Sequence, residues 1–316
     1  MTFNLLPLAI FVFVFEGIKH SQHRKNISNI LNLLILNLLS PFSETDPHFR
    51  TFDNQFFSYH GQCDLVLTRS IGFASGLGLH VHIRTTRVSN PHVDYSFISA
   101  ASVMIGNDIL EVSDAGKLVI NGNSINVPYS STSSVISFAG TYALKASVKG
   151  RQKRIVIYDL DFGDDGGIQI RANTKTGMIN VDVSKAFQDS EGLLGAAPKG
   201  STKVPLLGRD GVTDFNGYWN NYGEEWQVND SDPKLFQDTD RFPQFPKGCI
   251  YEEAVLDGAK KSLRRRLMED ASRVSLEAAT EACSHLKGQV KEFCVTDIMA
   301  TGDLDLAEDP FYGYNL

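Results

Sequence analysis

The sequence predicts a mainly β protein: an antiparallel β-sandwich of short strands, followed by a small C-terminal helical hairpin. Three observations predict this fold class. Short runs of apolar residues alternate with polar ones through the middle of the chain, turn-forming residues separate these runs, and a helical spacing of apolar residues begins only near the C-terminal end. Many strands without helices between them are typical of antiparallel sandwiches and barrels.

The chain begins with two apolar runs that precede the first strand. Residues 5–15, LLPLAIFVFVF, have the length of a signal-peptide core and are short for a membrane-spanning helix. The second run, residues 30–39, follows a patch of three basic residues, an order that suits a signal or a signal anchor. An amphipathic surface helix, or a start site placed too far upstream, is the alternative. We expect residues 1–41 to be a hydrophobic leader, either a signal peptide or an anchor that tethers the chain to a membrane.

The run LGLHVHIR, residues 77–84, shows the strand pattern clearly. Leucine, valine and isoleucine alternate with glycine, histidine and arginine, so the two sets of side chains point to opposite faces. We expect one face to lie in the core and the face with His80 and His82 to meet solvent. Similar runs follow, separated by turn signals such as NG at 121–122 and DDGG at 164–167.

The pattern changes after about residue 247. A charged stretch with three consecutive arginines, Arg264–Arg266, precedes residues 276–286, where apolar residues recur at spacings of three and four as on a helix face. Gly288 separates this helix from a second one expected over 290–299. The chain therefore divides into four parts: a leader over 1–41, a β domain over 45–249, a charged linker over 250–270 and a helical tail over 271–316.

The bulk composition limits the partners. Hydrophobic residues make up 42% of the chain and charged residues 21%, which is ordinary for a folded protein, and the formal net charge is −7. Binding to nucleic acid needs a basic face that neutralises phosphates, and the longest basic cluster is the arginine triplet. We expect no nucleic-acid partner.

Four cysteines allow three disulfide connectivities: Cys63, Cys249, Cys283 and Cys294. Cys283 and Cys294 lie in the two expected tail helices. A disulfide between them would stabilise a helical hairpin that is too small to fold stably without it. That leaves Cys63 to join Cys249, closing a long loop between the first strand region and its exit. In the chain-entropy model such a bridge stabilises by several kcal/mol. Four buried free thiols in an intracellular protein are the alternative.

The stretch TDPHFRTFDNQFFSYHGQCDLVL, residues 45–67, carries the most specific motif. DPHFRTFD, an aromatic strand and GQCDLVL resemble the start of a von Willebrand factor type D domain, where the pattern is roughly GDPHY-x-TFDG followed by G-x-C-x-Y-V-L. EGLLG at 191–195 is similar to the family's CGLCGN segment, and GEEWQV at 223–228 to its closing strand. In that family the first cysteine pairs with one shortly after the closing strand, which agrees with a bridge from Cys63 to Cys249. The tail resembles a remnant of the eight-cysteine helical module that often follows such domains.

The chain departs from the family pattern at two sites. Where the family has C-G-L-C, residues 191–194 read EGLL, so the vicinal dithiol that disulfide exchange needs is missing. The resemblance also implies a calcium site, of which the chain keeps Asp53 and Asp214, with Asp210 as a substitute. Alanine and proline stand where two further ligands would be. We expect Asp53 and Asp214 to cap turns rather than to complete a site. We therefore expect no cofactor, with a calcium ion held by Asp53, Asp210 and Asp214 as the alternative.

Other chemical motifs are short and isolated. His80 and His82 could chelate zinc with a third histidine, and the aspartates between 159 and 165 could form an acid/base pair, but a solvent-facing strand and an acidic hairpin tip are the simpler interpretations. Asn26-Ile27-Ser28 and Asn229-Asp230-Ser231 fit the N-glycosylation pattern. The sequence therefore carries no enzyme signature.

These features together predict a non-enzymatic extracellular module with a structural, adhesive or protein-interaction role, secreted or anchored on the extracellular side. Proteins with such domains are adhesion, matrix, mucin-like or lipid-carrying proteins, so the resemblance implies extracellular proteins or matrix glycans as partners. One alternative is a lipid- or ligand-binding module, which needs a large apolar cavity between sheets. The other is a divergent secreted hydrolase, which needs a cleft with converging carboxylates or histidines.

Overall fold

The structure is a computed structural model that describes a β domain and the helical tail. The described residues are 47–59, 61–90, 93–113, 116–126, 134–150, 153–184, 186–187, 189–197, 206–211, 219–237 and 274–307. The expected leader over 1–41, the expected linker over 250–270 and Cys249 lie outside these ranges. Among the described residues, no helix is long and apolar enough to cross a membrane.

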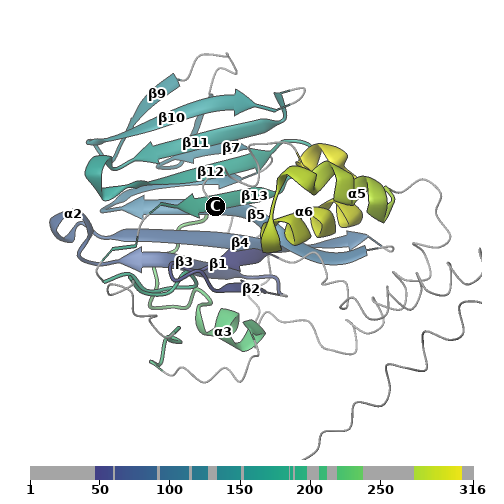
Figure 1. The fold of residues 1–316 in the computed structure, drawn as a ribbon. Helices are drawn as coiled ribbons and strands as arrows, with labels where there is room; N and C mark the ends of the chain where they lie inside the picture. The colour runs from purple at the N-terminus through teal and green to yellow at the C-terminus, as the bar shows by residue number, and fades with distance from the viewer. Residues whose placement is uncertain are drawn as a thin grey trace, which may run out of the picture. The chain divides into compact units, whose positions relative to one another are not determined.

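Three antiparallel sheets confirm the mainly β prediction (Figure 1). Their strand orders are β1-β2, β3-β4-β5-β6-β7-β8 and β13-β12-β11-β10-β9, so neighbours in space are neighbours in the chain. The strands are β1 (His48–Arg50), β2 (Phe56–Ser58), β3 (Asp64–Ser70), β4 (Leu79–Asn90), β5 (Val93–Ile105), β6 (Asp108–Ser113), β7 (Lys117–Ile120), β8 (Asn123–Ile125), β9 (Ser134–Phe138), β10 (Tyr142–Lys149), β11 (Ile155–Asp161), β12 (Gly167–Asn173) and β13 (Ile179–Val183). Most strands are short as predicted, whereas β4 and β5 form a long hairpin.

The helical elements are short apart from one helix in the tail. They are α2 (Phe73–Gly76), η2 (Gly163–Asp165), α3 (Trp219–Glu225), α5 (Leu276–Ala282), η3 (Cys283–His285), α6 (Gly288–Thr301) and η4 (Leu304–Ala307). The Ser275 hydroxyl caps α5 by accepting a hydrogen bond from the backbone N–H of Ala278, and Gly302 ends α6 in the left-handed conformation. The predicted helical hairpin is therefore present.

The core lies between the two large sheets and follows the predicted alternation along β4. Leu79, Val81 and Ile83 have no exposed surface and belong to one apolar cluster with Ile168 and Ile170 of β12. Their burial supplies most of the force that holds the sheets together, because apolar burial stabilises in proportion to the area removed from water.

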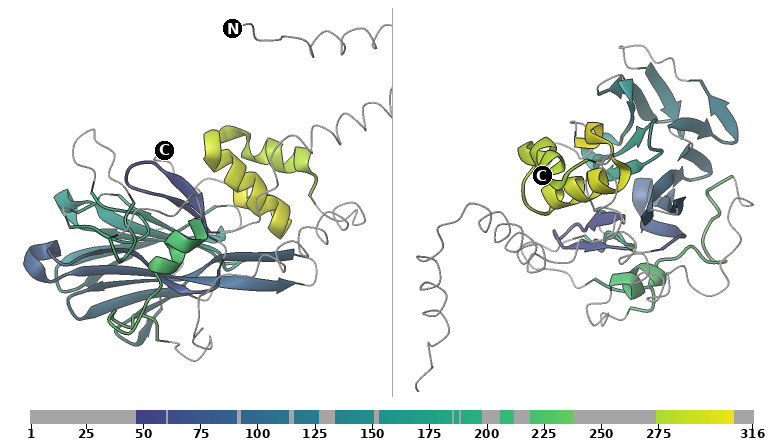
Figure 2. Two further views of the ribbon diagram at one scale, coloured as in Figure 1. Left: turned by 90° about the horizontal axis from the view of Figure 1, so that it is seen from below. Right: turned by 90° about the vertical axis from the view of Figure 1, so that its right-hand side faces the viewer.

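The opposite face of β4 is largely closed to solvent, which corrects the prediction for His82, whereas His80 is only partly buried. His82 is 1% exposed and Arg84 is 7% exposed. A covering segment, Trp226–Gln237, crosses this face: it bonds to β3 through Trp226 O and Val66 N at 2.8 Å, and to β6 through Gln237 N and a Glu111 carboxylate oxygen at 3.0 Å. The central strands of the six-stranded sheet are thus covered on both faces, whereas β8 at its edge is largely exposed. Figure 2 shows α3 beside this sheet at the start of the segment.

One carboxylate fastens the covering segment to the sheet. The side chain of Asp232 has no exposed surface and accepts hydrogen bonds from Arg69 of β3 at 2.9 Å and from Arg209 at 2.9 and 3.0 Å. The backbone N–H of Asn229 donates to it at 2.9 Å. Both guanidinium groups also lie over the Trp226 ring, at 5.9 Å for Arg69 and 5.4 Å for Arg209. The buried charge is therefore compensated from two separate segments of the chain.

The helical tail packs on the outer face of the five-stranded sheet. Ile155 and Ile157 of β11 form a second apolar cluster with Ala279, Ile298 and other residues of the tail helices. At the rim of this contact, Arg154 bonds to Asp305 and Lys175 pairs with Asp303 at 2.8 Å. The tail is therefore docked by an apolar centre with ion pairs at its edge.

Replacing Asp232 by asparagine is expected to destabilise the domain by about 3 kcal/mol, because it leaves two partly buried guanidinium groups without their shared carboxylate. Urea unfolding of the two proteins measures the difference. Asp230→Asn is the matched control, because the carboxylate of Asp230 is fully exposed two residues away. Equal midpoints for Asp232→Asn and Asp230→Asn would show that the covering segment is held by its apolar contacts instead.

Candidate interaction groove

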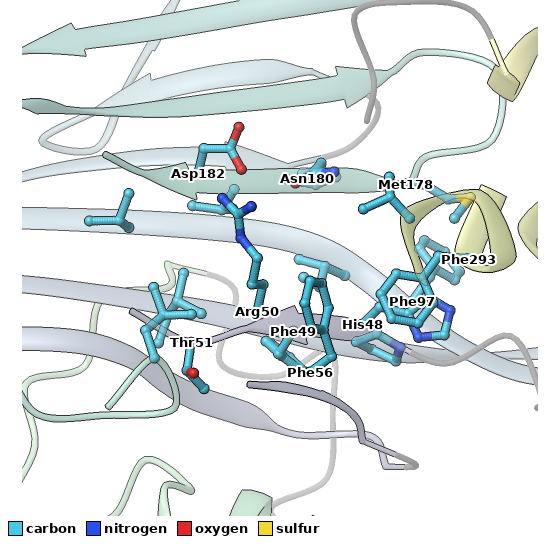
Figure 3. A pocket seen from close by; sticks show the side chains of 18 of the residues that line it. His48, Phe49, Arg50, Thr51, Phe56, Phe97, Met178, Asn180, Asp182 and Phe293 are labelled. Carbon is cyan, nitrogen blue, oxygen red and sulfur yellow. The ribbon is translucent and has the colours of Figure 1, made fainter. Parts of the chain in front are cut away.

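A groove opens at one edge of the sandwich, between strands β1 and β13 (Figure 3). Its volume is about 300 Å³. The hairpin of β1 and β2 lines one wall, β13 lines the other, and β5 and helix α6 close the ends and floor. The groove is therefore assembled from four parts of the chain that lie far apart in the sequence.

Strand β1 presents alternate side chains to the core and to the groove. Phe49 is buried and stacks on Phe57 with ring centroids 5.0 Å apart. His48 lies on the other side, where its ring stacks on Phe293 of α6 at 3.7 Å and its Nδ1 lies 2.7 Å from Ser58 Oγ. Arg50 points across the groove towards β13 and Asp182 (Figure 3). The period-two geometry of a strand thus gives the groove one aromatic stack and one cation.

Strand β13 turns an unpaired edge towards the groove. It is the terminal strand of its sheet, with β12 on one side. The backbone bonds Asn173 N–Met178 O and Ser184 N–Gly167 O fix the register, so the even-numbered residues of β13 bond to β12. The N–H and C=O groups of Ile179, Val181 and Val183 therefore point outwards. Within the described residues, no hydrogen bond joins them to another strand.

Apolar side chains form the remaining walls of the groove. Phe56 and Phe97 come from β2 and β5, Met178 precedes β13, and Val290 and Phe293 come from α6. Phe56 lies 6.1 Å from Phe293 between ring centroids. The groove thus combines an apolar lining, a few charges and a row of backbone donors and acceptors, a composition common in binding sites.

The turn after β1 carries the aspartate that the resemblance assigned to calcium. Asp53 accepts hydrogen bonds from the Thr51 hydroxyl and from Gln55 Nε2, the latter at 2.7 Å. The Thr51 hydroxyl in turn accepts the Gln55 backbone N–H at 3.0 Å. Asp53 therefore closes a turn, as expected. Asp210 is exposed, Asp214 lies outside the described residues, and no three metal-binding side chains converge among the residues that the structure describes.

The segment EGLLG, Glu191–Gly195, is an added strand-like element against β3. Leu193 N bonds to Val66 O and Leu194 N to Leu67 O, both at 3.1 Å, and Phe52 N bonds back to Leu194 O at 2.9 Å. Leu193 has no exposed surface, so leucine fills the core here. Gly192 has φ +130° and lies so close to β3 that a Cβ would meet Leu67 O at 2.7 Å, which requires glycine.

A scan against family models finds the von Willebrand factor type D domain over residues 43–197. The chain contains a von Willebrand factor type D domain. No curated protein matches the chain. The match covers β1 to EGLLG and thus both walls of the groove that the domain itself builds. It ends before the tail, so the relation of the tail to the eight-cysteine module stays a prediction.

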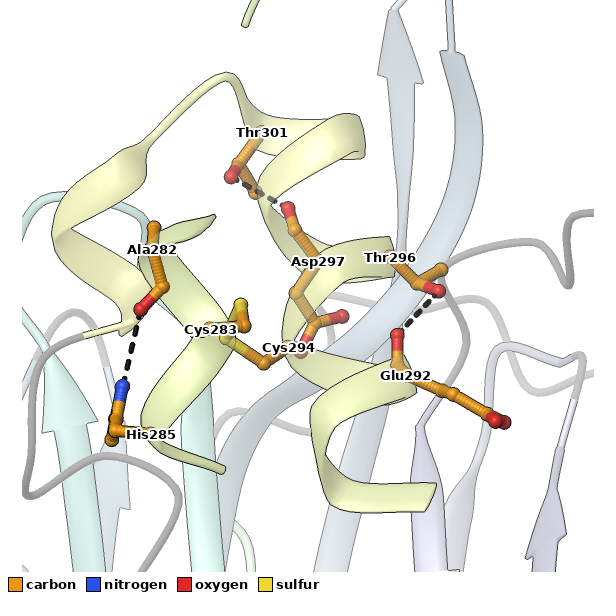
Figure 4. The surroundings of a disulfide bond; sticks show 8 residues. All are labelled: Ala282, Cys283, His285, Glu292, Cys294, Thr296, Asp297 and Thr301. Carbon is orange, nitrogen blue, oxygen red and sulfur yellow. Dashed lines mark hydrogen bonds between the residues drawn. A yellow bond between two sulfur atoms is a disulfide. The ribbon is translucent and has the colours of Figure 1, made fainter. Parts of the chain in front are cut away.

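The three cysteines within the described residues all form disulfide bonds. Cys283 and Cys294 form a disulfide between η3 and α6, and both are fully buried (Figure 4). Cys63 is buried and disulfide-bonded, and the Tyr59 hydroxyl lies 3.3 Å from its sulfur. Its expected partner, Cys249, lies outside the described residues, so that pairing stays a prediction.

The groups considered for catalysis lie apart from the groove. His82 is buried beneath the covering segment and His80 is partly buried beside it, with ring centroids 6.2 Å apart. Asp161 lies at the tip of the β11–β12 hairpin, where the Gly163 N–H and the Lys145 ammonium lower its pKa. No sequence motif pointed directly to the groove, although the alternation of His48, Phe49 and Arg50 in β1 already separates a polar face from the core.

Two histidines near the covering segment, His80 and His82, are expected to make its packing on the sheet less stable at acid pH. The pKa of His82 is lowered to about 3, first by burial and then by the charge of His80. Asp232 raises this pKa, and Arg209 and Arg69 lower it. Burial and then Arg69 lower the pKa of His80, against Asp232 and Glu191. Burial raises the pKa of Asp232, whereas the hydrogen bonds from Arg209 and Asn229 lower it. The net effect is a lowered pKa, so this carboxylate stays charged. Protonation of His82 would add an unpaired cation beside two guanidinium groups.

We expect the free energy that holds the covering segment on the sheet to be constant above pH 6.5 and to decrease as the pH falls towards 3. When the segment opens, His82 is exposed and binds a proton, whereas in the closed state its lowered pKa keeps it neutral. The loss is about 1.4 kcal/mol per pH unit for His82, hence about 2 kcal/mol at pH 5. Hydrogen exchange of the Val228 and Gln237 amides measures it. His82→Gln should remove most of the slope, whereas His285→Gln, at an exposed histidine, should leave it. A slope that survives His82→Gln would contradict the assignment.

Proposed function

We propose that this chain is a non-enzymatic extracellular interaction module whose domain binds an extended peptide segment of a protein partner. The single observation that carries the proposal is the unpaired edge of β13 inside the groove. Von Willebrand factor type D domains occur in extracellular proteins and are generally not enzymes, and this setting agrees with a structural or adhesive role.

The outward groups of Ile179, Val181 and Val183 can accept one further strand. Backbone hydrogen bonds to such an edge supply affinity, and side chains that alternate along the added strand supply specificity. One set of partner side chains would meet the apolar wall of Phe56 and Phe293, and the other would pass Arg50 and Asp182. A glycan has no backbone to match the edge, so the groove favours a peptide over a matrix glycan.

The two alternative functions find less support in the geometry. A lipid-binding module needs an apolar cavity between the sheets, but leucine, isoleucine and valine side chains fill that space, and the groove carries charges. A hydrolase needs acid and base groups that converge on an open cleft. His82 is buried beneath the covering segment instead, His80 beside it is only partly exposed, and Asp161 lies on an exposed hairpin tip.

The proposed extracellular setting is tested by non-reducing peptide mapping of the chain recovered from the medium of expressing cells. We expect Cys63 joined to Cys249 and Cys283 joined to Cys294, with the N-terminus read in the same experiment. Disulfides persist in the secretory route and are reduced in the cytosol. Four free thiols on a chain retained inside the cell would overturn the extracellular proposal.

Peptide binding is tested with Val181→Pro, which removes an outward N–H and leaves the bonds between β13 and β12 intact. A displayed library of linear peptides, selected on the secreted chain, supplies the probe. We expect Val181→Pro to weaken the best peptide about tenfold or more, since one hydrogen bond is lost and the ring blocks close pairing. Val181→Ala is the matched control, because it shortens the same side chain but keeps the N–H.

Equal affinity of the wild type and Val181→Pro would contradict strand addition at β13. Equal losses in Val181→Pro and Val181→Ala would assign the effect to side-chain packing instead. Thermal unfolding of both variants checks that the β domain is retained, because Val181 also packs against the main core.

A further inference from the structure

We propose that Asn229 carries an N-linked glycan in the mature protein. The inference rests on the proposed extracellular route, since glycan transfer takes place in the secretory pathway. It goes beyond that proposal by assigning a covalent modification to one residue of the covering segment.

The motif Asn229-Asp230-Ser231 lies on a turn that faces solvent. All three residues are exposed, and the Asp230 side chain has its full accessible surface. The residue between asparagine and serine is not proline, as the acceptor pattern requires. The other match, Asn26-Ile27-Ser28, lies outside the described residues, within the expected leader. The folded structure therefore offers room for a large sugar group at Asn229.

The hydrogen bonds of Asn229 leave its reactive atom available. Its side-chain oxygen accepts the Ser231 backbone N–H at 2.8 Å and the Ser231 hydroxyl at 2.6 Å. Its backbone N–H donates to Asp232, and its backbone oxygen accepts the Lys234 ammonium at 3.0 Å. No hydrogen bond uses Nδ2 among the described residues. All the contacts that hold the turn thus use atoms other than the one that bears the sugar.

The transfer needs an oligosaccharide activated as its lipid diphosphate. A bond forms between Asn229 Nδ2 and the anomeric carbon of the first sugar, and the bond from that carbon to the diphosphate oxygen breaks. The electron pair of the broken bond leaves with the lipid diphosphate, and Nδ2 loses one proton to a base of the transferring enzyme. No oxidant or reductant takes part. The product keeps the side-chain oxygen that accepts from Ser231.

A sugar at this position would leave the groove open. Asn229 does not line the groove, and its backbone N–H points inwards to the buried carboxylate of Asp232. The glycan would therefore project from the outer side of the covering segment and keep that surface in solvent. The interaction with a peptide partner at β13 and the modification at Asn229 are compatible in one molecule.

The test is mass spectrometry of the full chain secreted from eukaryotic cells and treated with peptide-N-glycosidase in ¹⁸O-water. We expect an ¹⁸O-labelled aspartate at position 229. Asn229→Gln and Ser231→Ala should each remove the label and the shift in gel mobility, and Ser231→Thr, which keeps the hydroxyl, should retain both. Ser231→Ala also covers the case in which Asn229→Gln disturbs the turn, because Asn229 itself remains.

The outcomes separate this inference from the proposed function. A disulfide-bonded, secreted chain with unmodified Asn229, or with sugar at Asn26 alone, overturns the glycan and leaves the extracellular proposal standing. A chain kept in the cytosol with free thiols overturns both. A label at position 229 that persists in Ser231→Ala would point to chemical deamidation and would also overturn the inference.

Discussion

The buried carboxylate of Asp232 is the interaction on which the rest of the domain depends. It is bonded by two guanidinium groups, one from β3 and one from the segment before α3, and those groups also lie over Trp226. A charge without exposed surface is costly unless each of its oxygens is bonded, and here both are. The covering segment can therefore be held in one register only. That register sets which side chains of β4 and β5 are closed from water.

This arrangement explains why a strand with two histidines and an arginine can lie in the interior. Arg84 pairs with Asp64 at 2.6 Å and lies over the Phe236 ring at 4.5 Å, and Ser102 bonds to Leu110 O and Leu235 O. His82 stays neutral because burial opposes its protonation. The covering segment shields this polar face from water, whereas Arg84 and Ser102 find their shortest hydrogen bonds within the sheet itself. Neither ring nitrogen of His82 has a hydrogen-bond partner in the described structure. One departure from the family pattern is also accommodated by burial, since Leu194, which stands where the family has its second cysteine, packs in the main apolar cluster.

We could predict the fold class, the core face of β4, the turns and the two tail helices from the sequence, because each depends on residues close together in the chain. The burial of His82 could not be predicted, because the residues that cover it come from far along the chain; Ser102 and its partner Leu235 are 133 positions apart. An alternating pattern identifies two faces of a strand but says only which of them is apolar. The groove was missed for a similar reason. His48, Val181 and Phe293 come together only after both sheets and the tail have packed.

The groove also bears on the aggregation risk that the unpaired edge of an open sheet creates. An unpaired edge invites pairing with other chains and hence aggregation, so edges are commonly short, charged or covered. Strand β13 has five residues and neither proline nor lysine, yet its outward groups lie in a groove walled by β1 and α6. A whole sheet cannot approach such an edge, because the walls exclude its neighbouring strands. Under the proposed function, a single extended peptide would enter the groove, and the walls would then turn this aggregation risk into selectivity for one strand.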